Sequence, residues 1–309
     1  FSVGILCGIA YTEKQFQNDG KPFQEPLPLS LVGRHEKPYA ASGTPLVTNS
    51  LRGLRLAFLW GSRRAVYGFT RLLPQRGMQK MDQQKNIIEL KNITVAFDGE
   101  PVLDDLNLSI KDGEFVTLLG ASGCGKTTTL RIIAGFLEPQ QGDVFFDGKR
   151  INDLPPYKRP VNTIFQRYAL FPHLNVYENV AFGLRIPKTD ENGKKIRISE
   201  EEIHQRVMEM LEIVNLSGFE KRSISALSGG QQQRVAIARA VISGPKLILA
   251  DEPTGNLDSV NGQEVMNLLK ELNQSGTTIV MVTHSRHDAS YASRIINLFD
   301  GSIVKELPQ

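Results

Sequence analysis

Cysteine is almost absent from this chain. Its 309 residues include only Cys7 and Cys124, which do not make the dense disulfide framework of a small secreted domain. Neither cysteine belongs to a cluster with metal-ligand spacing, so the sequence indicates no structural metal site. Both observations favour a reducing compartment such as the cytoplasm.

Long hydrophobic runs are also missing. No stretch approaches the roughly 18 consecutive apolar residues that a membrane span requires, because residues 1–10 are too few and arginine and glycine interrupt residues 51–73. With 40% hydrophobic residues and a net charge of +3, the chain can bury a sizeable core in about two domains, and its charge excludes no partner. We therefore expect attachment to a membrane only through a partner protein.

Acidic side chains are absent between Glu36 and Asp82. Residues 1–81 carry eleven Lys or Arg against four Asp or Glu, whereas the remainder carries 25 against 29. This change of charge places a boundary near residue 81. The basic segment is open to three interpretations. It is an amphipathic helix on an anionic membrane surface, an Arg-rich targeting segment or, as we favour, a segment that is foreign to the natural protein, whose own sequence would then start near Met81.

One glycine-rich motif, GASGCGKT at residues 120–127, fits the P-loop pattern. In that pattern the backbone N–H groups of small residues surround phosphate oxygens at the start of a helix. A β-rich run at 114–119 precedes the motif and a helical pattern at 128–134 follows it, so a chance glycine turn is the minor alternative. Lys126 is predicted to reach the β/γ-phosphates and Thr127 to bind Mg²⁺. The predicted nucleotide contacts are Gly120, Ala121, Ser122, Gly123, Cys124, Gly125, Lys126, Thr127 and Thr128.

A second motif, KLILADE at residues 246–252, is an apolar strand that ends in two carboxylates. Buried parallel strands have this composition, and ligand sites in open α/β sheets lie at the carboxyl ends of strands. Asp251 is therefore predicted to hold Mg²⁺, directly or through water, and Glu252 to act as general base on the attacking water. Without a P-loop upstream, a strand capped by two solvated acids would be the better interpretation.

A third motif, LSGGQQQRVAIARA at residues 227–240, leaves a helix N-terminus with few side chains and outward-pointing donors, which is a second anion site. This stretch resembles the signature of ATP-binding-cassette (ABC) ATPases. The resemblance implies two copies arranged head to tail with ATP between them, and it adds Ser228, Gly229, Gly230 and Gln231 to the predicted ATP contacts. Taken alone, the motif is a serine-capped helix.

Further residues match the family's pattern. Gln166 resembles the Q-loop glutamine, which contacts Mg²⁺ and the attacking water, and His284 resembles the switch histidine, which contacts the γ-phosphate and orients Glu252. Phe97 resembles the aromatic that stacks on adenine, although an aromatic at a strand end is equally often part of a core. Residues 256–258 (NLD) resemble the loop that crosses the dimer interface, and the alternative is an ordinary loop.

The resemblance implies an α/β fold, the P-loop NTPase ABC cassette, with a parallel-sheet RecA-like core, an antiparallel β subdomain and an α-helical signature subdomain at about 167–240. Residues 81–309 are assigned to this ATP-binding domain, and residues 1–80 to a basic leader that is disordered or non-native. The sequence predicts strands at 87–97, 101–110, 143–146 and 278–282, helices at 199–215 and 262–273, and a polar surface loop at 187–195.

The transported substrate is indicated less clearly. Residues 82–253 resemble spermidine/putrescine importer ATPases, in which residues 168–174 would face a permease; the alternative is that Tyr168, Leu170, Phe171 and Leu174 pack inside the helical subdomain. Residues 254–309 resemble macrolide-exporter and lipoprotein-release ATPases instead. A natural mosaic or an artificial join near Pro253 would explain both resemblances.

The favoured function is therefore an Mg²⁺-dependent ATPase that drives import of a small solute, with polyamine as the first candidate. It would pair with a second ATPase subunit and with transmembrane permease subunits on the cytoplasmic face of the membrane, and indirectly with a solute-binding protein. The first alternative is an export or lipoprotein-release ATPase. The second is a soluble ABC protein acting on ribosomes or DNA; it ranks low because the chain has one P-loop and one signature, so we expect no nucleic-acid partner.

Overall fold

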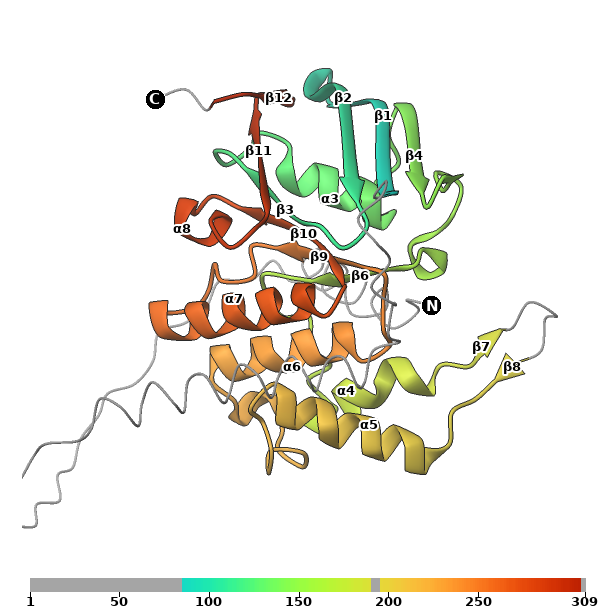
Figure 1. The fold of residues 1–309 in the computed structure, drawn as a ribbon, viewed down its shortest axis with the longest axis vertical. Helices are drawn as coiled ribbons and strands as arrows, with labels where there is room; N and C mark the ends of the chain where they lie inside the picture. The colour runs from blue at the N-terminus through green and yellow to red at the C-terminus, as the bar shows by residue number, and fades with distance from the viewer. Residues whose placement is uncertain (1–84, 190–194, 307–309) are drawn as a thin grey trace, which may run out of the picture.

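The computed structural model describes residues 85–189 and 195–306. The interpretations of the basic leader, and the tip of the predicted loop at 187–195, lie outside these residues. In the described part, a parallel sheet lies between a smaller antiparallel sheet with helix α3 on one side and a group of helices on the other (Figure 1).

The parallel sheet carries the P-loop strand at its centre. Its order is β12-β11-β3-β10-β9-β6, and every neighbouring pair is parallel except β11 and β12. The strands are β3 (Phe115–Leu119), β6 (Val161–Ile164), β9 (Leu247–Asp251), β10 (Thr278–Thr283), β11 (Arg294–Phe299) and β12 (Ser302–Val304). The carboxyl ends of β3, β6, β9 and β10 therefore meet at one edge of the sheet.

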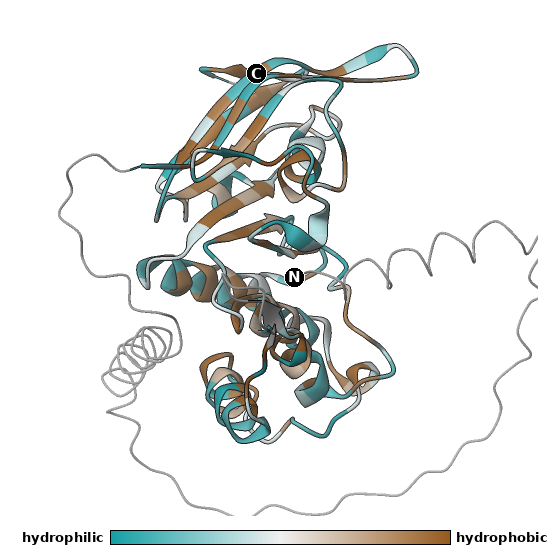
Figure 2. Cartoon of the chain, turned by 90° about the vertical axis from the view of Figure 1, so that its right-hand side faces the viewer, coloured by the Kyte–Doolittle hydropathy of each residue, from teal (hydrophilic) through white to brown (hydrophobic). Residues whose placement is uncertain are grey.

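Two hydrophobic cores lie on the two faces of this sheet. In β10, Val280 and Val282 belong to the core beneath the antiparallel sheet, whereas Ile279 and Met281 belong to the core beneath the helices. This period of two explains why β3, β9 and β10 consist almost wholly of buried residues, since a strand covered on both faces needs apolar side chains at every position. Figure 2 shows the same strands as predominantly hydrophobic.

The antiparallel sheet has the order β2-β1-β4-β5. Its strands are β1 (Asn86–Phe97), β2 (Glu100–Lys111), β4 (Gln141–Phe146) and β5 (Lys149–Arg150). The first three match the predicted strands at 87–97, 101–110 and 143–146, which confirms the antiparallel subdomain. This sheet and helix α3 (Lys126–Ala134) share one core with the parallel sheet.

The helical group confirms the predicted helix at 199–215. Helix α5 (Glu200–Ile213) is capped by Ser199, whose side chain accepts a hydrogen bond from Glu202 N, and it buries one apolar face made of Ile203, Val207, Met210 and Leu211. The other helices of the described residues are α4 (Val176–Arg185), α6 (Gly229–Val241), α7 (Ser259–Gln274) and α8 (Arg286–Ala289), with 3₁₀ turns η1 (Pro156–Lys158) and η2 (Ile224–Ala226).

Three predicted boundaries need correction. The P-loop helix begins at Lys126 rather than at residue 128, and α7 extends three residues before the predicted helix at 262–273, because Asp258 caps it. The predicted surface loop at 187–195 is wrong at its ends, which pair as the short strands β7 (Lys188–Thr189) and β8 (Lys195–Ile196).

None of the helices in the described residues combines the length and the apolar composition that crossing a membrane would require.

Candidate nucleotide site

The P-loop joins β3 to α3, and two of its glycines are fixed by close neighbours. Gly125 caps α3 with φ +97°, and a Cβ there would lie 2.6 Å from Leu103 Cδ2. A Cβ on Gly120 would meet the backbone oxygen of Leu298. Only glycine fits such positions. Ala121, Ser122 and Gly123 form the exposed tip of the loop, so their backbone N–H groups are accessible to an anion.

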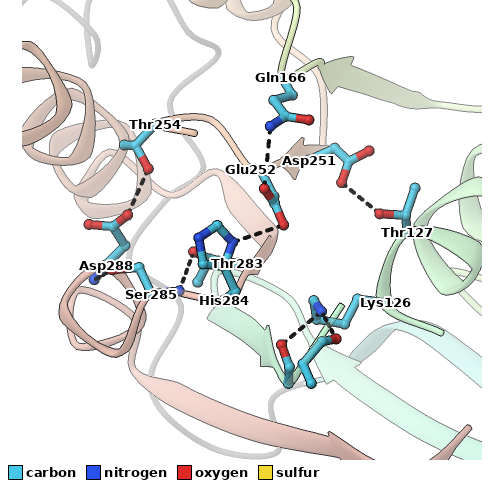
Figure 3. Close-up of polar contacts among 12 residues, drawn as sticks. Lys126, Thr127, Gln166, Asp251, Glu252, Thr254, Thr283, His284, Ser285 and Asp288 are labelled. Carbon is cyan, nitrogen blue, oxygen red and sulfur yellow. Dashed lines mark hydrogen bonds and ion pairs between the residues drawn. The ribbon is translucent and has the colours of Figure 1, made fainter. Parts of the chain in front are cut away.

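Lys126 lies inside the curve of this loop. The residue is 5% exposed, and its Nζ donates hydrogen bonds to Gly120 O at 2.8 Å and Ala121 O at 2.5 Å. Figure 3 shows these contacts. Cys124 is also buried, with its Sγ 3.7 Å from the same ammonium. The cationic group is therefore held where the loop would surround a phosphate.

Thr127 and Asp251 form the first link between the P-loop and β9. Thr127 Oγ1 donates to Asp251 Oδ1 at 3.0 Å. Burial, and secondarily the neighbouring Glu252 carboxylate, raise the pKa of Asp251 above its ordinary value, while the bond from Thr127 opposes this rise. A buried carboxylate beside a hydroxyl is a pair of oxygen donors suited to Mg²⁺, which takes one or two carboxylates and completes its shell with phosphates and water.

This donor set fits Mg²⁺ better than a metal held wholly by protein. The described residues contain no group of three or more His, Cys, Asp or Glu side chains that could hold an ion. Thr127 and Asp251 are the side chains placed to bind it, whereas Gln166, the third predicted ligand, makes its side-chain contact with Glu252.

Glu252 follows β9 directly and is contacted on both carboxylate oxygens. Gln166 Nε2 donates to Oε2 at 3.4 Å, and His284 Nδ1 lies 3.2 Å from Oε1 (Figure 3). An ionised carboxylate can only accept, so His284 must carry its proton on Nδ1 to make this bond. The three predicted catalytic residues, which come from the ends of β6, β9 and β10, therefore meet at one point.

The NLD segment lies next to this cluster. Asn256 Nδ2 donates to Gln166 O at 2.9 Å, Leu257 packs against the helical core, and Asp258 caps α7. Within one chain the segment thus connects the Q-loop to α7. Its predicted role in crossing a dimer interface stays a prediction.

The signature motif begins helix α6 in the helical group. Ser228 and Gln231 form a reciprocal capping box, in which Gln231 Oε1 accepts from Ser228 N at 3.0 Å. The Gln231 side chain, predicted to contact ATP, is used in this cap. A Cβ on Gly229 would lie 2.8 Å from the Tyr168 hydroxyl, and one on Gly230 would collide with Asn261 Oδ1.

Phe97 lies at the end of β1 and is 48% exposed, as a stacking residue would be. The predicted docking residues Tyr168, Leu170, Phe171 and Leu174 are all half-buried. Arg239 of α6 holds this segment by donating to Tyr168 O and Ala169 O and by lying 5.2 Å from the Phe171 ring centroid. These residues therefore combine packing against the helical subdomain with partial exposure.

Sequence reasoning missed several residues that join the motifs. Arg239 and Gln233 act from α6, where the fully buried Gln233 donates to Pro253 O at 2.8 Å. Asn261 acts from the first turn of α7, Asp288 from α8 and Thr254 from the loop after β9. The burial of Gln233 could have been predicted from the sequence. It lies three residues after Gly230 and four before Ile237, which places it on the buried face of the helix.

Comparisons with known proteins identify the family to which this chain is similar. A family model described as ABC transporter matches residues 103–255. The spermidine/putrescine import ATP-binding protein PotA of Clostridium novyi (strain NT) is 50% identical over 224 residues, which are 72% of this chain and 62% of that protein. The PotA protein of Clostridioides difficile (strain 630) is 52% identical over 221 residues, or 71% and 61%. The chain thus spans about 60% of the length of these curated relatives.

Solved structures give the same answer. The dimeric ABC transporter cassette MJ0796 superposes with a TM-score of 0.62 and 41% identity, covering 70% of this chain and 96% of that one. The cbiO1 protein of Clostridium perfringens, part of the cbiONQ ABC transporter complex, has the same TM-score with 29% identity and covers 71% and 87%. On its motifs, its fold and these similarities, the chain belongs to the ATP-binding cassettes of the ABC transporter family.

Proposed function

We propose that the chain is the ATP-hydrolysing subunit of an ABC importer and that polyamine is its first candidate cargo. The observation that carries the ATPase proposal is the convergence of Glu252, Gln166 and His284 beside the Thr127–Asp251 pair. Support for import comes from the PotA relatives at about 50% identity, whose printed names specify spermidine/putrescine import.

In the proposed reaction, Glu252 accepts a proton from the attacking water while Gln166 and His284 hold its two oxygens. Thr127 and Asp251 would hold Mg²⁺, which would neutralise the negative charge that develops on the phosphates. A neutral imidazole has one N–H donor and the imidazolium has two. His284 must therefore be in the doubly protonated imidazolium form to donate to a γ-phosphate through Nε2 and to Glu252 through Nδ1 at the same time. Lys126 and the P-loop N–H groups bind the phosphates.

The site is proposed to be completed by a second copy. Ser228 and Gly230 begin α6, which lies in the helical group, while the P-loop begins α3 on the opposite face of the parallel sheet (Figure 1). One chain does not bring both to the same phosphate. Head-to-tail pairing would place the signature of one protomer over the ATP of its partner, and the dimeric form of the MJ0796 cassette supports the formation of a dimer.

The dimer proposal is tested with Glu252→Gln. Removing the general base while keeping the shape of the side chain should preserve ATP binding, abolish hydrolysis and trap a dimer in saturating Mg²⁺-ATP, measured by light scattering. Glu201→Gln, an exposed position on α5, is the matched control and should hydrolyse ATP and return to monomer. A Glu252→Gln variant that stays monomeric in ATP would count against the mechanism.

The transport role is tested by recovering partners of Glu252→Gln from native membranes with ATP. Multi-span permeases accompanied by a solute-binding protein would support import, with the ATPase bound peripherally on the cytoplasmic face. The second candidate, an exporter or lipoprotein-release ATPase, is favoured by the resemblance of residues 254–309, where Ser285 to Asp288 form the start of α8. Recovery of a few-span permease with a large extracytoplasmic domain would support it.

A further inference from the structure

Two residues outside the family motifs link the loops that follow β9 and β10. Thr254 Oγ1 donates to Asp288 Oδ2 at 2.6 Å, across 34 positions of sequence. The Asp288 side chain is only 15% exposed. A short bond to a shielded carboxylate is stronger than a neutral surface bond. This pair is therefore a firm contact between the two loops, and Figure 3 shows it next to the catalytic cluster.

The contact closes a ring that contains both Glu252 and His284. Glu252 is two residues before Thr254, and Asp288 is four residues after His284. Within the second loop, Asp288 N donates to Ser285 Oγ at 3.2 Å, and Ser285 N donates to Thr283 Oγ1 at 3.0 Å. The ring is completed by the 3.2 Å contact between His284 Nδ1 and Glu252 Oε1.

His284 depends on its backbone for orientation. Its side chain is 64% exposed, so surrounding packing restricts it little. The backbone that carries it runs into α8, which has only four residues, and a helix of one turn has little stability of its own. Asp288 lies within that turn. Its bond to Thr254 therefore holds α8, and through Ser285 the histidine, at a fixed distance from the glutamate.

We propose that Thr254 and Asp288 form a brace that positions His284 against Glu252 for ATP hydrolysis. This inference rests on the proposed ATPase function. Both are positioning residues, because neither touches the reacting atoms. The brace predicts a specific kinetic signature: its loss slows the chemical step, which needs the histidine and the glutamate in register, and leaves nucleotide binding at the P-loop unchanged.

The test is steady-state ATPase kinetics of Thr254→Val, which removes the hydroxyl and keeps the volume. The expected result is a fall in kcat of about 10-fold to 100-fold, as for small misplacements of catalytic groups, with KM for ATP changed less than about twofold. Thr254→Ser keeps the hydroxyl and should retain most of the kcat. Asp288→Ala should resemble Thr254→Val, and the double variant should be no slower than either single variant, since one contact is lost in all three.

Ser290→Ala is the matched control. Ser290 Oγ donates to His287 O at 2.7 Å within the same turn but outside the ring, so its removal should leave kcat unchanged. Wild-type kcat in Thr254→Val would overturn the brace. So would a fall in kcat that comes with a higher KM and a lower melting temperature and that serine does not rescue, which indicates a general packing role. Failure of the wild-type protein to hydrolyse ATP would refute the proposed function itself, separately from the brace.

Discussion

Arg159 contacts the C-terminal end of the P-loop helix α3, and replacing it with methionine tests how much this contact stabilises the helix. The residue is 5% exposed, and burial lowers its pKa to about 10, which leaves it charged at neutral pH. Its guanidinium donates four hydrogen bonds to backbone oxygens, which belong to Ile132 at 2.6 Å, Ile133 at 2.9 Å, Leu154 at 2.9 Å and Asn152 at 3.2 Å.

Two of these oxygens are in the last turn of α3, where a cation is favoured by the helix dipole. Ile132 O also accepts from Gly135 N at 3.1 Å, so this oxygen keeps a partner when Arg159 is replaced. Arg159→Met keeps the apolar stem and removes all four donors. Each buried oxygen left without a partner costs about 1–3 kcal/mol. Because Ile132 O stays paired, and because water entry and relaxation satisfy part of the remaining oxygens, we expect a total loss of about 3–5 kcal/mol.

For a domain of 150–250 residues, each kcal/mol lowers the melting temperature by about 2–4 °C, so Arg159→Met should melt about 6–20 °C below wild type in calorimetry. Arg150→Met is the control, because Arg150 is exposed and pairs at the surface with Asp143 and Asp153; such pairs contribute little. Equal melting temperatures for the two variants would show that the carbonyl contacts of Arg159 do not stabilise the helix.

Two further substitutions test the site. Gly230→Ala would displace Asn261, whose Nδ2 donates to Asp258 Oδ2 at 2.6 Å; ATP-dependent dimerisation should weaken in light scattering, and Asn261→Ala in the same chain should partly restore it. Asp251→Asn should abolish hydrolysis yet raise the melting temperature at pH 7. Because the folded pKa of Asp251 is raised above 3.8, its ionisation costs stability above that folded pKa, and the advantage of the asparagine should vanish below pH 3.8. An Asp251→Asn variant less stable than wild type at pH 7 would contradict this sign.

Local signals in the sequence were sufficient for most elements of the fold. Strands β3, β9 and β10 are runs of apolar residues because both of their faces are covered. Helix α5 combines a serine cap with a regular apolar stripe, and both are visible in the letters. The P-loop and the two carboxylates at the end of β9 also follow from pattern, since each motif is contiguous in the chain.

The contacts between motifs could not be predicted in the same way. Asn256 donates to Gln166 O across 90 positions, and Thr254 meets Asp288 across 34. Both depend on the strand order β3-β10-β9-β6, in which neighbours in space are not neighbours in sequence, and hydrophobic periodicity carries no information about that order. Gln231 is a different case. The family resemblance assigned it to ATP, yet the spacing S-x-x-Q from Ser228 to Gln231 is a capping-box signature, from which the observed hydrogen bond could have been predicted.

The backbone of Glu252 gives an independent reason to regard its surroundings as a positioning frame. Its φ is +45°, a conformation that costs a residue with a side chain on the order of 1–2 kcal/mol and persists only where neighbours enforce it. Three kinds of contact do so here. Glu252 N donates to Val282 O at 3.0 Å, which extends the pairing of β9 with β10, and Gly255 N donates back to Glu252 O at 3.0 Å.

The third kind of contact comes from side chains beyond the glutamate. Gln233 of the signature helix holds Pro253 O, and Asp288 holds Thr254, so both residues after Glu252 are fixed from different elements. If the side-chain rotamer alone set the direction of the carboxylate, the strained backbone conformation of Glu252 would not be needed. The left-handed turn directs the Glu252 side chain toward Gln166 and His284, and the contacts that stabilise the turn come from the signature helix and from the loop that carries His284. The position of the proposed general base is thus coupled to the loop that carries His284 in its own site and, through the signature helix, to the element that is proposed to contact the ATP of the partner protomer.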